Sequence, residues 1–307
     1  MPLSMDSRLR NFRADRRTSA EDALPSLVRD VLGGAEMTGE AGTCYVIRRT
    51  YREKIALPPC EPERLRRNLR LLRGVGPRTE ERLRGLGIDD LEQLAEHDRW
   101  SGQAREILQD ITVRDVRRLK RRGVQDRDVL SLLLPADLVF VDIETTGLYN
   151  VLPLFLVGLL YADGDELHLV QYLARRFEEE RPVLAAVVAE FSRFKTIVSY
   201  NGRAFDVPYL TGRCLAQRVS CRLEHVHIDL LCHVRRKYRG RLPDCRLATV
   251  EGALLCRGPR TDDTPGHLIP DLYHYFVKTQ DQEIIRGIIE HNAQDLLALA
   301  RLLPLVE

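Results

Sequence analysis

LVFVDIETTGL, residues 138–148, begins as an apolar run rich in β-branched and aromatic residues and then places two acids, Asp142 and Glu144, one residue apart. Such a run, followed by polar residues, predicts a buried strand. Because side chains alternate along a strand, Asp142 and Glu144 point to the same face. Two carboxylates held together raise each other's pKa unless a cation lies between them. The pattern therefore predicts a positively charged partner at the end of this strand.

The last long helical pattern, expected from about residue 282 to residue 303, has polar residues within its inward-facing stripe. His291 and Asp295 are four residues apart, so they share one face of the helix. A buried carboxylate without a partner is costly, and Asp295 therefore needs one. Taken alone, the pair is explained equally well by a buried His–Asp hydrogen bond. The whole stripe, at helical spacing, is Ile284, Ile288, His291, Asp295, Leu299 and Leu302.

A further acid follows a short predicted strand in IVSYNGRAFDVPYL, residues 197–210. Asp206 lies between Phe205 and Val207 in this segment, within otherwise apolar surroundings. By itself, such an aspartate is more typical of a helix N-cap or a turn than of a catalytic site. Its interpretation as part of a site depends on the other acids.

Four acids thus lie at strand ends or on core-facing helix surfaces. Carboxylates that converge on one point need divalent cations, and oxygen ligands with few His or Cys favour Mg²⁺ or Mn²⁺ over zinc. Two such ions, ~4 Å apart, are what an in-line attack on a phosphodiester uses, since one activates water and the other holds the leaving oxygen. The predicted ligands of the two ions are Asp142, Glu144, Asp206 and Asp295.

The segments FVDIETTGL, SYNGRAFD and HNAQD resemble the three exonuclease motifs of the DEDD superfamily, in the same order and with similar separations. Members of that superfamily have a ribonuclease H-like fold and remove nucleotides from 3′ ends. The resemblance covers residues 138–303. It implies a 3′–5′ exonuclease in which the four acids are catalytic metal ligands and His291 is the general base for the attacking water.

The same resemblance implies which side chains meet the substrate. It places Thr145, Thr146 and Leu148 beside the 3′ end of the nucleic acid. Asn201 and Phe205 would line the same cleft. All of these residues lie in or directly after the motifs that carry the acids.

Residues 227–255 and 263–276 resemble the bacterial YprB-like branch of ribonuclease H-like proteins. In the His-type branch of the DEDD superfamily, the histidine lies five residues before the last aspartate; in the Tyr-type branch a tyrosine lies four before it. This chain has His291 at the tyrosine spacing. The spacing leaves open whether His291 accepts the proton directly or through a second water.

The length of 307 residues allows one large or two smaller domains. We expect a poorly defined segment over residues 1–60 with a short strand near 43–51, a helical region over 61–135, and an α/β domain over 136–307. The predicted fold class is α/β, a ribonuclease H-like mixed sheet flanked by helices and preceded by a small all-α domain. Within the α/β domain we expect a strand from 138, a hairpin over 154–173, a helix over 179–194, a strand over 195–200 and a helix after 201–205.

Residues 69–97 resemble a helix-hairpin-helix module that binds nucleic acid. Gly74 and Gly76 would let the backbone approach a phosphate, and the amides that open the next helix would direct the positive end of its dipole there. Charge contacts would come from four arginines, Arg73, Arg78, Arg82 and Arg84. Residues 105–134 fit a degenerate second hairpin and an ordinary helical bundle equally well. Because such a module binds phosphates, it favours nucleic acid as the partner, with DNA favoured over RNA.

Composition excludes several other classes of protein. The chain is 44% hydrophobic and 30% charged, and no apolar run reaches the ~18 residues that a membrane span needs. No secretory signal is visible, so we expect a cytoplasmic protein without a membrane partner. Seven cysteines without a CxxC pair do not predict a disulfide framework, and a structural metal among the cysteines of residues 214–256 is a weaker alternative to reduced thiols. Residues 1–135 carry 27 Lys and Arg against 22 Asp and Glu, a mild basic excess.

Two other functions remain open from the sequence. The same metal site could cut internally, as in a ribonuclease H-like endonuclease. Alternatively, the chain could be a catalytically silent scaffold that binds nucleic acid through its helical region. A basic cluster within residues 235–241 fits a phosphate track and a solvated helix end equally well.

Overall fold

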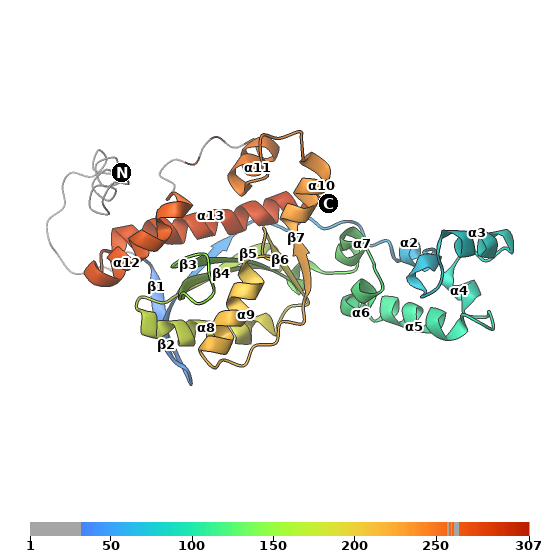
Figure 1. Ribbon diagram of the computed structural model, residues 1–307, viewed down its shortest axis with the longest axis horizontal. Helices are drawn as coiled ribbons and strands as arrows, with labels where there is room; N and C mark the ends of the chain where they lie inside the picture. The colour runs from blue at the N-terminus through green and yellow to red at the C-terminus, as the bar shows by residue number, and fades with distance from the viewer. Residues whose placement is uncertain (1–31, 257, 259, 261–263, 307) are drawn as a thin grey trace.

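The computed structural model of the protein describes residues 32–256, 258, 260 and 264–306. Residues 1–31, half of the segment expected to be poorly defined, lie outside the described residues. An α/β part and a group of short helices to one side of it make up the described chain (Figure 1). The limits proposed for the three regions stay a prediction.

Among the described residues, seven strands form one mixed sheet in the order β1-β2-β5-β4-β3-β6-β7. β3, β6 and β7 are parallel, and the other neighbours are antiparallel. This confirms the predicted α/β class with a mixed sheet and flanking helices, including the hairpin of β4 and β5. The strands are β1 (Gly34–Gly39), β2 (Gly42–Tyr51), β3 (Leu138–Thr145), β4 (Leu154–Asp163), β5 (Glu166–Leu173), β6 (Thr196–Ser199) and β7 (Val226–Asp229).

The N-terminal strands belong to the same sheet as the acid-bearing strand. β2 matches the strand expected near residues 43–51, and it pairs antiparallel with β5, with Tyr45 opposite Leu173. The sequence did not predict β1, nor the pairing of β2 with a strand more than a hundred residues later. Such a pairing depends on contacts between distant segments, which local patterns do not encode.

Helices cover both faces of the sheet, with α13 on one face and α8 and α9 on the other (Figure 1). Alternate side chains of β3 serve the two faces: Phe140 packs in the cluster that contains Leu296 of α13, and Val141 packs with Val187 of α8. The acids at 142 and 144 therefore lie on the α13 side. The helices of this part are η3 (Pro135–Asp137), η4 (Phe177–Glu179), α8 (Glu180–Phe191), α9 (Asp206–Ala216), α10 (Leu230–Tyr238), α11 (Leu247–Leu254), η5 (Gly266–Leu268), α12 (Ile269–Thr279) and α13 (Gln282–Val306).

The helical group contains two similar glycine turns. Gly74 and Gly123 both have φ of +88°, and each is followed by a buried valine, Val75 or Val124. A positive φ of this size favours glycine, so each turn depends on that residue. The identification of these turns as helix-hairpin-helix elements stays a prediction. The helices are α2 (Pro62–Arg66), η2 (Leu69–Leu71), α3 (Pro77–Gly85), α4 (Leu91–Leu94), α5 (Ser101–Thr112), α6 (Val116–Arg121) and α7 (Asp126–Ser131).

None of the helices in the described ranges combines the length and the apolar character that crossing a membrane requires. The cytoplasmic location stays a prediction. All seven cysteines are free thiols. Within the described part of the chain, no group of three Cys, His, Asp or Glu residues is arranged to hold a metal ion, and this includes the cysteines of residues 214–256.

At Gly158 of β4, side chains of α13 lie close against the sheet. Gly158 lies opposite Asp142 of β3 and Gln171 of β5 in the strand register. A Cβ atom built on Gly158 would lie 2.1 Å from Oδ1 of Asn292 and 2.5 Å from Cδ1 of Leu296. The absent side chain therefore makes room for Asn292, which reaches the strand that carries the acids.

We predict that Gly158→Ala destabilises the protein by about 1–3 kcal/mol, because the added methyl group overpacks the contact between β4 and α13. Equilibrium unfolding in urea measures this loss. Gly85→Ala is the matched control, since no atom lies within 4 Å of a Cβ built at that helical position. An equal effect of the two substitutions would contradict this account of the packing.

Candidate active site

The four predicted acids come from three elements that meet at one end of β3. Asp142 and Glu144 are half-buried on β3, where a register shift after Glu144 ends the regular pairing with β4. Asp206 is the first residue of α9 and is buried. Asp295 is half-buried in the middle of α13. The negative charges of the other three acids all act on the Asp142 carboxyl group, so the structure brings the predicted set together.

The pKa of Asp142 is raised well above its ordinary value. The largest cause is its position deep among protein atoms, and the charges of Asp295, Glu144 and Asp206 add to it. A hydrogen bond from Asn292 acts in the opposite direction. This is the response expected when like charges share a site with insufficient positive charge.

Burial also raises the pKa of Asp206, to about 7. The charge of Asp229 raises it further, while backbone hydrogen bonds at Asp206 itself and at Ile143 oppose the shift. Asp229 ends β7 and accepts hydrogen bonds from the backbone amides of Asn201, at 2.8 Å, and Arg203, at 3.0 Å. A fifth acid therefore organises the loop that leads to Asp206.

Asn292 links the first acid to the interior of the sheet. Its Nδ2 donates to Oδ2 of Asp142 at 2.7 Å, and its Oδ1 accepts from Nε2 of Gln171 at 2.8 Å. The side chains of Asn292 and Gln171 are both fully buried. Gln171 also donates to the Ile289 carbonyl at 2.8 Å, which fixes its orientation. Asp142 is thus held in place by a chain of amides that runs across β4.

A guanidinium contacts the cluster at Asp295, whereas a cation between Asp142 and Glu144 stays a prediction. Nη1 of Arg260 donates to Oδ1 of Asp295 at 2.6 Å. The same side chain donates twice to Oε2 of Glu251, at 2.7 and 3.0 Å. Glu251 is buried in α11, so Arg260 joins that helix to the acid cluster. In the described residues, no three carboxylate, imidazole or thiol groups are already gathered as a metal cage.

His291 lies one helical turn before Asp295, as predicted. Its Nε2 is 3.7 Å from Oδ2 of Asp295, which is too long for a hydrogen bond. At this distance the two side chains form an ion pair when the imidazole is protonated. The imidazole is half-buried at the edge of the cluster.

The two threonines predicted to meet the substrate are buried and support the loop after β3. Oγ1 of Thr145 donates to the Gly147 carbonyl at 2.7 Å, and Oγ1 of Thr146 donates to the Pro153 carbonyl at 2.9 Å. Leu148, in contrast, is 80% exposed. The loop is further held by Arg213, whose Nη1 donates to the Val151 carbonyl at 3.0 Å. The structure therefore presents Leu148 on a well-anchored loop beside the acids.

Asn201 and Phe205 flank the turn that leads into α9. Asn201 is exposed and has φ of +66°, a left-handed conformation that asparagine tolerates. Phe205 is half-buried against Tyr209, with ring centroids 5.3 Å apart. Phe205 directly precedes Asp206, and Asn201 lies five residues before it. That these two residues line the substrate cleft stays a prediction.

The predicted phosphate-binding residues of the helical group lie in a different part of the molecule from the acids (Figure 1). Gly74, Gly76 and Arg78 are exposed around the start of α3. Arg84, which we expected to add a further charge contact, is instead 3.1 Å from Glu80 and 3.3 Å from Asp89. The structure does not bring this set to the acid cluster.

Several functional candidates escaped the sequence reasoning. Asn292 lies inside the motif HNAQD, but an asparagine between His291 and Ala293 carries no specific signal. Asp229 directly precedes an apolar helix, a pattern that indicates only an N-cap. Glu251 and Arg260 are close in sequence but were not distinguishable from surface residues. Their roles follow from burial and from contacts with distant elements.

We predict that Asp206→Asn changes how stability depends on pH in the presence of a chelator. A carboxyl group whose folded pKa is raised binds its proton more tightly in the folded state, so the stability it contributes is full below the ordinary value of 3.8 and is lost as pH rises to about 7. The variant lacks this loss, so its free energy of unfolding gains on the wild type from pH 4 to pH 7. Urea unfolding at several pH values measures the difference.

Asp165→Asn is the control for that experiment, because this exposed side chain pairs only with Lys54 among the described residues. A difference between wild type and Asp206→Asn that stays constant over the pH range would contradict the assigned cause.

Known proteins resemble parts of this chain. The chain is 34% identical over 170 residues to the uncharacterized protein YprB of Bacillus subtilis (strain 168), a match that covers 54% of this chain and 41% of that protein. The chain thus spans well under half of that relative's length. Among solved structures, a family B DNA polymerase from the archaeon Pyrobaculum calidifontis shows 20% identity and a TM-score of 0.43, covering 56% of this chain and 25% of the polymerase. A likeness at that level carries no argument about function.

A family model described as the RNase H superfamily matches residues 139–306, which include all four acids and His291. The matched region begins within β3 and ends with α13, so it contains most of the sheet, both helical layers and the acid cluster. The chain belongs to the RNase H superfamily.

Proposed function

We propose that the protein is a two-metal-ion 3′–5′ exonuclease that hydrolyses phosphodiester bonds of nucleic acid, with DNA as the favoured substrate. The observation that carries this proposal is the convergence of four acids from β3, α9 and α13 around Asp142. The RNase H-like fold supports a nuclease. The exonuclease assignment rests on the resemblance of the motifs to the DEDD superfamily.

The donor set fits the divalent ions that such nucleases use. The four acids offer oxygen ligands, which Mg²⁺ and Mn²⁺ prefer. Burial first, and then the charges of the three other acids, raise the pKa of Asp142, so a bound cation would stabilise its ionised form. Bound to Asp142, Glu144, Asp206 and Asp295, such ions would lower the pKa of a water molecule and stabilise the leaving oxygen.

The remaining residues of the site have roles that follow from their contacts. His291, beside Asp295 at the edge of the cluster, accepts a proton from the attacking water. Asn292 keeps the Asp142 carboxyl group in one orientation through its hydrogen bond of 2.7 Å. Leu148, exposed on its anchored loop, packs against the terminal base. Asn201 and Phe205 form the wall beside Asp206.

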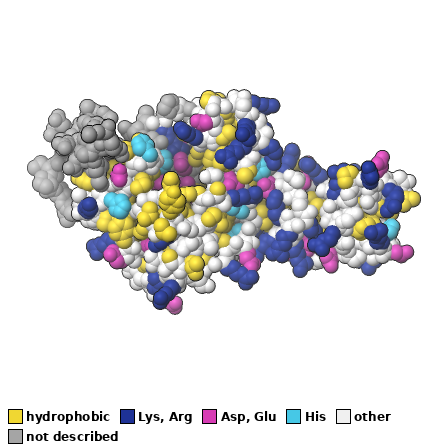
Figure 2. Space-filling model, in the orientation of Figure 1, with side chains coloured by type: hydrophobic (Ala, Val, Ile, Leu, Met, Phe, Trp, Pro, Cys, Tyr) yellow, Lys and Arg dark blue, Asp and Glu magenta, His cyan; other side chains and the backbone are white. Residues whose placement is uncertain are grey.

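The helical group supplies a second contact with nucleic acid. α3 begins without a side-chain cap, at Gly76 in an extended conformation, so the first amides of the helix are available to a phosphate. Arg78 is exposed next to them. Binding of this kind is independent of base sequence and weakens with salt. Figure 2 shows Lys and Arg side chains on this group and at its junction with the α/β part.

We predict that Asp142→Asn and Asp295→Asn each abolish the shortening of a 5′-labelled oligodeoxynucleotide in Mg²⁺ or Mn²⁺. Each substitution removes a charged ligand, whereas Asn292→Ala removes only a supporting contact and should reduce activity by roughly 10–100-fold. Gel analysis of the product ladder measures the rates. Matched single- and double-stranded DNA and RNA substrates identify the preferred polymer.

Circular dichroism and calorimetric titration with Mn²⁺ control for misfolding and report metal binding directly. Full activity of either aspartate variant would refute the metal site. A substrate with a blocked 3′ end separates the alternatives, because an endonuclease would still cut it and an exonuclease would not. A scaffold without activity would take up no pair of ions.

A further inference from the structure

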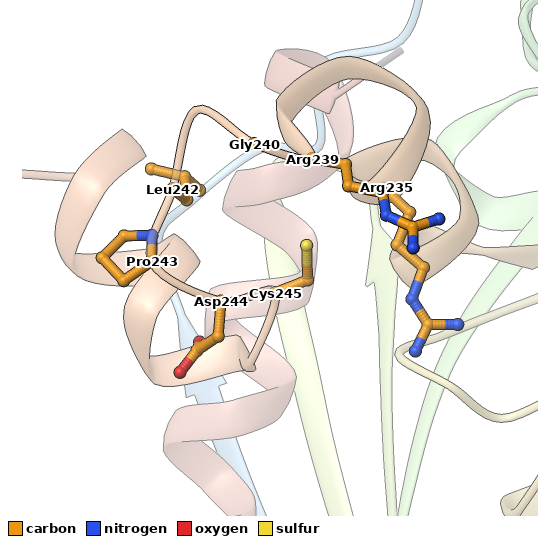
Figure 3. A pocket seen from close by; sticks show the side chains of 7 residues that line it. All are labelled: Arg235, Arg239, Gly240, Leu242, Pro243, Asp244 and Cys245. Carbon is orange, nitrogen blue, oxygen red and sulfur yellow. The ribbon is translucent and has the colours of Figure 1, made fainter.

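A cavity of about 460 Å³ lies where α10 ends, and none of the four acids lines it. One side is formed by the side chains of Arg235 and Arg239, and the other by the turn that leads to α11 (Figure 3). Its volume is in the range of sites that hold small ligands. The lining residues are Arg235, Arg239, Gly240, Leu242, Pro243, Asp244 and Cys245.

The two arginines are suited to bind an anion. Arg235 lies in the last turn of α10 and Arg239 is the residue that follows the helix, and in Figure 3 both guanidinium groups lie on the same side of the cavity. Among the described residues, neither has a carboxylate partner. By contrast, the neighbouring Arg236 contacts His233 and Lys237 contacts the Leu305 carbonyl. A favourable helix dipole explains basic residues near this end of α10, but not why two of them face one cavity.

Asp244, the acid that lines the cavity, is engaged elsewhere. Its Oδ1 accepts a hydrogen bond from the Arg246 amide at 2.9 Å, ahead of α11. Hydrogen bonds to Thr249 and to Arg246 lower the pKa of Asp244, so it stays ionised at the start of that helix. The cavity therefore combines two cations with a mostly uncharged opposite wall that includes Leu242 and Pro243.

The shape of the cavity is fixed by contacts within the fold. The Tyr238 carbonyl accepts hydrogen bonds from the amides of Arg241, at 2.8 Å, and Leu242, at 3.2 Å. Within this turn, Gly240 has φ of +79°. Oη of Tyr200 donates to the Cys245 carbonyl at 2.6 Å. Tyr200 immediately precedes Asn201, so the wall of the cavity is tied to the segment that leads to Asp206.

We propose that this cavity binds one nucleotide of the substrate strand, with its phosphate between Arg235 and Arg239 and its sugar or base against Leu242 and Pro243. Guanidinium groups suit this role, because they bind phosphate oxygens in a fork geometry. The inference rests on the proposed function. If the 3′ end occupies the acid cluster, any nucleotide held elsewhere must lie on its 5′ side. The cavity then sets a minimum length for tight binding.

The test compares Arg235→Gln/Arg239→Gln with wild type in a chelator, which prevents cleavage. Fluorescence anisotropy measures the affinity for 5′-labelled single-stranded oligodeoxynucleotides of increasing length. Wild type should gain affinity once the strand is long enough to reach the cavity. The double variant should lose that gain, by at least about 10-fold, while binding a dinucleotide as wild type does. The slope of log affinity against log salt for long strands should also become shallower by about 0.7 for each phosphate that the variant no longer neutralises.

Arg176→Gln/Arg286→Gln is the matched control, because it removes the same charge from two positions outside the cavity. Equal affinities of the two double variants at every length would overturn the proposal. Cleavage of the same strands in Mn²⁺ is measured in parallel. Wild-type cleavage with no effect of the Arg235 and Arg239 substitutions on binding would refute the cavity but not the nuclease. A length-dependent loss of binding without any wild-type cleavage would refute the nuclease but not the cavity.

Discussion

The repulsion among carboxylates around Asp142 is the constraint on which the rest of the structure depends. Burial and the charges of three other acids raise the pKa of Asp142. Bringing these groups together opposes folding, so other parts of the molecule must hold them. A long helix, α13, packed across the sheet supplies that support, together with a guanidinium on Asp295. The folded protein therefore contains a cluster of acids that a bound divalent ion would stabilise.

The hydrogen bond that orients Asp142 depends on a glycine in the neighbouring strand. Gly158 lets Asn292 reach across β4, and Gln171 holds the far side of the amide. Nδ2 and Oδ1 of Asn292 are both hydrogen-bonded, and a buried amide is costly when unpaired, so this side chain has one favourable orientation. It orients the carboxylate before any ion or substrate arrives. Preorganisation of this kind is what a site needs in order to stabilise charge that develops during a reaction.

The nucleic-acid contacts that we propose are spread over the molecule. Leu148 would contact the terminal base. Its loop is anchored by the buried pair of Arg213 and Glu180, in which Nη2 lies 2.6 Å from Oε2. The cavity at the end of α10 would hold a nucleotide further along the strand, and the glycine turn before α3 would hold a phosphate at a distance. α10 is also connected to the helical group, since Nε2 of His233 lies 2.9 Å from Oδ2 of Asp126. One nucleic-acid strand could therefore contact these connected elements along its length.

The sequence by itself determined the fold class, five of the seven described strands and the helices α8, α9 and α13. These elements follow from local periodicity, which reports the face of a strand or helix on which a residue lies. The expectation that the four acids share one site came from the resemblance of three motifs to those of one superfamily. Only the tertiary structure decided that β1 and β2 complete the sheet, that Asn292 orients Asp142, and that Arg260 and Glu251 join the cluster. The tertiary structure also decided that arginines at the end of α10 line a cavity. Those features come from contacts between segments far apart in the chain, and the local pattern around each residue does not contain them.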